Sequence, residues 1–139
     1  MTSRQGGPED VRRSTGEVLG LGFLGVRVGD RAAFRSTVAL YRDVLGLQPV
    51  RLEPDRLAWF RLADGTALHV YGPEDTDHLA FGERPCVGLR VDDVEGTRRR
   101  MEAEGVRFLW DTQRDEQHAW AHYRGPDGTV YELIGPLGP

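Results

Sequence analysis

The chain has 139 residues, of which 39% are hydrophobic and 29% are charged, and its formal net charge at pH 7 is −4. This balance is typical of a soluble globular protein, and the lack of a basic tail or stripe argues against a nucleic-acid partner. Without a long apolar run or an apolar signal core, we expect a cytoplasmic protein with no membrane partner. The single cysteine, Cys86, excludes an internal disulfide.

Residues 1–17 are polar and without periodicity, and we expect them to form a disordered or expression-derived tail. In residues 18–73, the pattern predicts a strand over 19–28 and then a helix that Asp30 caps and Gly46 ends. Three strands should follow, at about 49–53, 57–62 and 66–71. A polar linker, residues 74–85, should face solvent with its His78.

Residues 86–137 repeat this order. The pattern predicts a strand over 86–91, a helix capped by Asp93 and ended by Gly105, and strands at about 108–110, 118–123 and 129–134. His118 and the acidic residues just before it are expected in an exposed hairpin loop.

An internal repeat supports the two units. ADGTALHVYGP, residues 63–73, recurs as PDGTVYELIGP 63 residues further on, and FLGVRV, residues 23–28, recurs as CVGLRV at the same shift. Ala58-Trp59 echoes Ala119-Trp120 at a shift of 61, which predicts a shorter helix and longer hairpins in the second unit. We therefore predict a single α+β domain of two βαβββ modules (18–73 and 86–137), paired around a cleft.

Strand alternation separates two faces of the predicted sheet. Apolar side chains such as Leu24 and Val26 should lie under the helices, whereas the ionisable side chains should face the cleft. Indole and guanidinium groups on this inner face suit a flat, partly anionic or oxygen-rich ligand. The candidate ligand-binding residues are Phe23, Arg27, Trp59, Arg61, His69, Tyr71, Arg90, Trp120, His122 and Glu132.

Three motifs resemble the vicinal oxygen chelate superfamily of glyoxalases, bleomycin resistance proteins and dioxygenases: LYRDVLGL (40–47), RVDDVE (90–95) and GPDGTVYEL (125–133). The resemblance implies paired βαβββ modules, frequent homodimers and, in catalytic members, a divalent metal in the cleft. The modules of such a dimer can pair within one chain or be exchanged between two. The family's ligand positions fall here on Phe23, His69, Cys86 and Glu132, and phenylalanine cannot bind a metal.

These observations leave three hypotheses open. The first is a binding protein for a small aromatic or polyoxygenated molecule, in which His69 and Glu132 bond to each other or to the ligand, or Glu132 pairs with Arg27 or Arg90. The second is a metal-dependent lyase, isomerase or dioxygenase that holds one divalent ion, zinc or similar, through His69, Cys86 and Glu132. The third is a structural or regulatory dimer whose cleft binds nothing.

Overall fold

The computed structural model describes residues 17–138. In the first unit, strand β1 (Val18–Arg27) leads to helix α2 (Arg31–Ala39) and the π-helical turn η1 (Leu40–Val44), then to β2 (Pro49–Glu53), β3 (Leu57–Arg61) and β4 (Ala67–Tyr71). The short helix η2 (Leu79–Phe81) lies in the linker. The second unit contains β5 (Cys86–Val91), α3 (Val94–Ala103), β6 (Arg107–Phe108), β7 (Gln113–Arg114), β8 (His118–Arg124) and β9 (Val130–Pro136).

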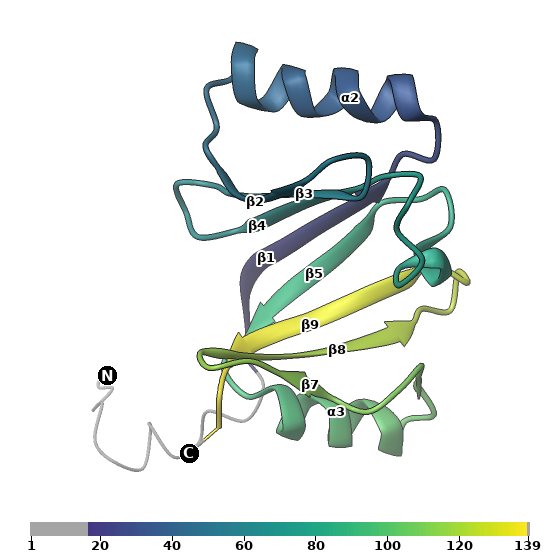
Figure 1. Cartoon of the computed structure of the whole chain (residues 1–139). Coiled ribbons are helices and arrows are strands. Elements are labelled where there is room, and N and C mark those ends of the chain that lie inside the picture. Colours follow the sequence, from purple (N-terminus) through teal and green to yellow (C-terminus); the bar gives the residue numbers. More distant parts are fainter. Residues whose placement is uncertain (1–16, 139) are drawn as a thin grey trace.

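All the strands join one nine-stranded sheet in the order β2-β3-β4-β1-β5-β9-β8-β6, with β7 also paired to β8. The two units meet where β1 runs antiparallel to β5 at the middle of the sheet. Within each unit the first strand pairs in parallel with the last, β1 with β4 and β5 with β9. Figure 1 shows α2 and α3 at opposite ends of the molecule, with the sheet between them. The modules of this chain therefore pair with each other, as the α+β prediction required.

Local signals place the helices. The Asp30 carboxylate accepts from the Ala33 N–H at 2.8 Å, and the Asp93 carboxylate accepts from the Gly96 N–H at 3.0 Å, so both predicted N-caps are confirmed. Gly46 has a φ of 73°, a left-handed conformation that glycine adopts without strain, just after the first helical segment ends. The π-helical turn and the short strand β7 were not predicted.

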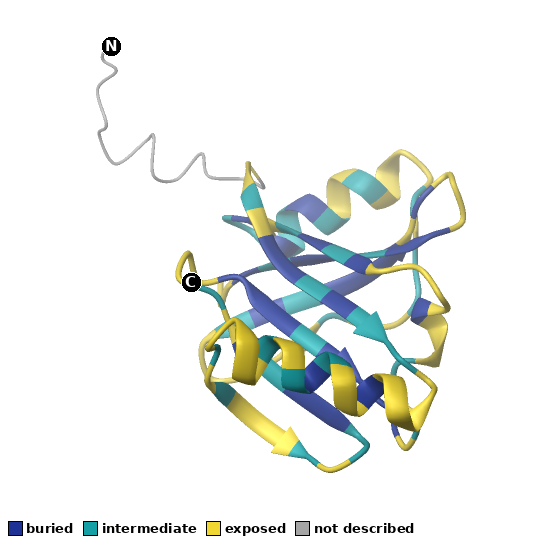
Figure 2. Cartoon of the chain, turned by 90° about the horizontal axis from the view of Figure 1, so that it is seen from above, coloured by how far each residue is buried: buried dark blue, intermediate teal, exposed yellow. Residues whose placement is uncertain are grey.

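Two apolar cores lie under the helices. Phe34 and Val38 of α2 pack on β3 and β4, and Leu24 and Val26 of β1 join them as predicted. Val94 of α3 packs on the second unit in the same way. Figure 2 shows the buried inner faces and exposed outer faces of these helices. The opposite face of the sheet is thereby left to form the site.

The sheet register corrects one reading of the repeat. Trp59 pairs with His69, and His122 pairs with Glu132, so a shift of 63 holds through both hairpins. The structural counterpart of Trp59 is therefore His122 and not Trp120, and the echo at 61 residues was wrong as an alignment. The second helix is shorter, as predicted, and the added length lies between α3 and β8, where β7 forms.

Within residues 17–138, none of the helices is long and apolar enough to cross a membrane. Residues 1–16 of the predicted tail lie outside the described part of the chain.

Candidate functional site

A pocket of about 690 Å³ lies on the inner face of the sheet and is lined by residues of both units and of the linker. Aromatic side chains form much of its wall, and histidines and charged groups are placed among them. The aromatic residues are Phe23, Trp59, Tyr71, Phe81, Trp110 and Trp120, and the histidines are His69, His78, His118 and His122. A concave site with aromatic walls and a few polar groups is typical of small-molecule recognition.

Phe23 stands at the centre of this face. It is 4% exposed, and its ring lies 5.0 Å from the His69 ring and 6.4 Å from the Phe81 ring, edge to face in both cases. A β-carbon added at Gly25 would meet the outer atoms of the Phe23 ring at 2.7 Å, so the ring lies directly over this glycine. A β-carbon added at Gly88 would lie 2.6 Å from Cβ of Phe23 and 3.3 Å from Oε2 of Glu132. The Phe23 side chain thus extends from Glu132 to His69.

His69 belongs to an aromatic group of the first unit. Its Nδ1 lies 2.8 Å from the Tyr71 hydroxyl, and its ring stacks on Trp59 with a centroid distance of 4.7 Å. Burial lowers the pKa of His69 to about 3, so the imidazole is neutral at physiological pH. Burial also raises the pKa of Tyr71 above its usual range, which keeps the phenol protonated.

Glu132 and His122 form a second polar pair in the second unit. Oε1 of Glu132 lies 2.9 Å from Nε2 of His122, and both side chains are almost fully buried. Burial raises the pKa of Glu132, and the contact with His122 opposes that rise. Within the described chain, neither ring nitrogen of His122 makes a well-aligned hydrogen bond. The predicted bonds from Glu132 to His69, Arg27 or Arg90 are therefore replaced by a contact with His122.

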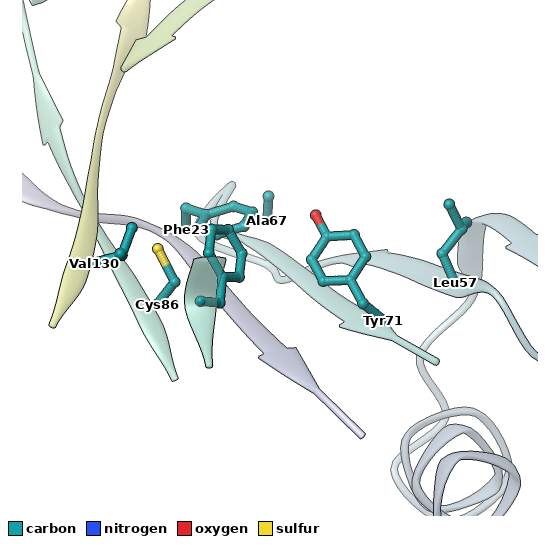
Figure 3. Close-up of a cluster of buried hydrophobic side chains, with 7 residues drawn as sticks. Phe23, Leu57, Ala67, Tyr71, Cys86 and Val130 are labelled. Atoms are coloured by element: carbon teal, nitrogen blue, oxygen red, sulfur yellow. The ribbon is translucent and has the colours of Figure 1, made fainter. Parts of the chain in front are cut away.

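Cys86 lies beneath the pocket and does not line it. Its side chain is fully buried, and Figure 3 shows its thiol between Val130 and Phe23. Burial in these surroundings, with a smaller contribution from Glu132, raises the pKa of the thiol, which disfavours the thiolate that would bind a metal.

The predicted metal set of His69, Cys86 and Glu132 does not fit an ion. No three His, Cys, Asp or Glu side chains in residues 17–138 are grouped so that they could hold one. Phe23 lies between His69 and Glu132, each of these has another polar partner, and the Cys86 thiol is held protonated. The sequence could place these residues on one face, but it could not show that a phenyl ring separates them.

Two arginines lie at the end of the pocket beside the 62–66 turn. Nη1 of Arg61 donates to the carbonyl of Gly65 at 3.2 Å. The pKa of Asp64 in this turn is lowered mainly by the N–H and hydroxyl of Thr66, and Arg90 contributes to the shift. Both arginines are exposed and line the pocket, so they give this end a positive edge.

Nine of the ten candidate ligand-binding residues line the pocket, and Arg27 does not. Arg27 is the last residue of β1, and it pairs with Tyr71 in the ladder between β1 and β4, beyond the end of the pocket. Trp120 lines the pocket, and its Nε1 donates to Oε1 of Gln113 at 2.7 Å.

The linker contributes residues that sequence reasoning placed in solvent. Asp75 is 1% exposed, and His78 and Phe81 line the pocket. His118, expected in an exposed loop, is the first residue of β8 and lines the pocket as well. The spacing of Asp75 and His78 was a usable signal, because an aspartate often accepts from backbone N–H groups shortly after it in a turn.

Fold and pocket together define a protein of two fused βαβββ units with a binding site on their shared sheet. The sequence profile of the Glyoxalase/Bleomycin resistance protein/Dioxygenase superfamily matches residues 20–133, and the chain belongs to this superfamily. No curated protein matches the sequence significantly.

Solved structures share the fold. Methylmalonyl-CoA epimerase from Mycobacterium tuberculosis is 21% identical with a TM-score of 0.62, over 87% of this chain and 90% of the other. A single-residue variant of Streptomyces coelicolor methylmalonyl-CoA epimerase, in complex with 2-nitronate-propionyl-CoA, is 19% identical with a TM-score of 0.61, over 88% and 100%. A superfamily member from Vibrio splendidus 12B01 is 18% identical with a TM-score of 0.56, over 88% and 100%. At these identities the likeness concerns the fold alone.

Proposed function

We propose that the chain binds a flat aromatic molecule with an anionic or oxygen-rich edge in this pocket, with no metal ion at the centre. The observation that carries the proposal is the position of Phe23. Its ring fills the middle of the face where the superfamily's metal ligands fall, and it makes that region an apolar floor.

The walls suit such a ligand. Trp59 and Trp120 offer broad, rigid surfaces on the two sides of the pocket, since they come from β3 and β8. Arg61 and Arg90 can hold a carboxylate or several oxygens at the end beside the 62–66 turn. The ligand would therefore lie with its ring over Phe23 and its charged edge toward the two guanidinium groups.

The metal-dependent lyase, isomerase or dioxygenase hypothesis has no observation in its favour beyond kinship. The superfamily includes epimerases among the similar folds, but His69, Cys86 and Glu132 do not form a metal site in this chain. A cytoplasmic location and a homodimer remain predictions.

A matched pair of ligands tests the proposal: 2-naphthoate and the neutral 2-naphthylmethanol, measured by isothermal titration calorimetry and by the thermal midpoint. Both should bind, and EDTA should not change their affinities. Trp120→Ala should weaken both about tenfold, the size expected for a buried aromatic contact. Arg61→Ala should weaken the acid by up to about fivefold and leave the alcohol unaffected, because this arginine is exposed.

Arg124→Ala is the matched control. Arg124 is the repeat counterpart of Arg61 and makes the same bond to a turn glycine, Gly128, but it does not line this pocket. Failure of both ligands to bind, or binding that is lost with EDTA and restored by a divalent ion, would overturn the proposal.

A further inference from the structure

The linker carries an imidazole held by a buried carboxylate. The Asp75 side chain accepts from the backbone N–H of His78 at 3.1 Å and lies 3.0 Å from Nδ1 of the same residue. An ionised Asp75 fixes the proton of the neutral ring on Nδ1, so Nε2 is free to accept a proton. Serine hydrolases use the same arrangement of carboxylate and imidazole to orient a general base.

The surrounding rings hold His78 at the pocket wall. Its ring lies parallel to the Tyr71 ring at 3.7 Å, and the Phe81 ring is 5.3 Å away. Nε2 is on the ring edge opposite the bond to Asp75, and the residue lines the pocket. The neighbouring polar groups are Asp77 and His69, and Arg56 neutralises Asp77 at 3.3 Å.

Exposure distinguishes this pair from the other imidazole–carboxylate pair of the pocket. Both ring nitrogens of His122 are closed off, whereas the His78 side chain remains 26% exposed beside a fully buried carboxylate. Only the pair in the linker can therefore reach a ligand without rearrangement of the protein.

We propose that Asp75 and His78 form a general base that removes a proton from a carbon next to a carbonyl group of the bound aromatic acid. This inference rests on the proposed function, because it uses the same pocket and the same class of ligand. The carbon–hydrogen bond breaks, the proton moves to Nε2 of His78, and the electron pair enters the carbonyl group to form an enolate. Return of a proton from Nε2 to that carbon restores the ketone, so the step needs no other reactant.

Phenylpyruvate is the probe, since it combines an aromatic ring, a carboxylate and acidic C3 protons beside a ketone. In deuterium oxide, the protein should accelerate exchange of the C3 protons over the rate in buffer alone, as measured by proton NMR. His78→Ala should slow the protein-dependent exchange by about 100-fold or more, the usual size of a general-base contribution. Added imidazole should restore part of the rate in this variant, which a purely structural role of His78 would not allow.

Asp75 is a positioning residue, and its variant needs a separate readout. Asp75→Asn should lower the exchange rate about tenfold or more and leave the calorimetric Kd of phenylpyruvate unchanged, because the proton on the ring is no longer fixed on Nδ1. Glu74→Gln is the matched control, since the adjacent carboxylate is exposed, pairs with Arg31 and does not line the pocket.

The outcomes separate the two proposals. Tight binding of phenylpyruvate with exchange at the buffer rate overturns the general base and leaves the binding function intact. Absence of binding by phenylpyruvate and by 2-naphthoate overturns both. Exchange that persists undiminished in His78→Ala places the base elsewhere and refutes the assignment.

Discussion

The position of the Phe23 ring can be tested by overpacking the glycine beneath it. A β-carbon at position 25 would lie 2.7 Å from two ring atoms of Phe23 and 3.1 Å from one of Phe81, well inside ordinary contact of 3.4–4 Å. Such overpacking costs about 1–3 kcal/mol. The φ of Gly25 is not positive, so alanine there also removes the roughly 0.5–1 kcal/mol penalty of a strand glycine. Gly25→Ala should therefore lower the free energy of unfolding by about 1–2 kcal/mol.

Phe23→Leu provides the second arm, because leucine lacks the two outer ring atoms but keeps most of the apolar volume, at a cost of about 1–1.5 kcal/mol. In this background Gly25→Ala should be nearly neutral, which gives a favourable coupling of about 1–2 kcal/mol. Urea denaturation of the four proteins measures the coupling through the midpoints at constant m. If Gly25→Ala costs the same with phenylalanine as with leucine, the ring does not lie over this glycine, and the argument against a central metal loses its basis.

Further expectations concern pH, thiol reactivity and assembly. The pKa of His69 is lowered to about 3 by burial, so the unfolded chain binds a proton that the folded chain refuses between about pH 6.5 and 3. Stability should fall by about 2 kcal/mol from pH 7 to pH 5, and urea titrations of His69→Gln should show a smaller fall; an equal fall would place the titration elsewhere. The raised pKa of Cys86 predicts slow reaction with an aromatic disulfide reagent at pH 8 in the native protein and fast reaction in urea, and comparable rates would contradict the burial. The predicted homodimer should show twice the chain mass in light scattering, and the exposed Val44 and Val50 suggest η1 and β2 as the contact; Val50→Lys should then yield monomer, whereas an unchanged mass would exclude this surface.

The sequence allowed the framework to be predicted because its signals are local. Alternation along β1 assigned Leu24 and Val26 to the core, and the caps at Asp30 and Asp93 located both helices. These patterns depend on strand geometry and on neighbouring backbone groups, so they need no knowledge of distant contacts.

The details of the site depended on tertiary contacts. Which face Glu132 lies on follows from alternation, but its partner, His122, follows from the pairing of β8 with β9. The turn around Asp75 has no periodicity to read, and its burial arises only because the linker passes over the pocket and stacks His78 on Tyr71. A sequence pattern can thus assign a side chain to a surface, but it cannot identify the neighbour that it meets there.

The linker is the part of the domain for which the repeat has no second copy. The strands and helices of the two units must remain matched to each other across β1 and β5, and changes in them would disturb both halves. Residues 74–85 are free of that constraint, yet they bring Phe81 and His78 to the pocket. Relatives with the same duplicated frame could therefore acquire different chemistry by exchanging this one connection, and a graft of the segment between two such proteins would transfer selectivity without redesign of the sheet.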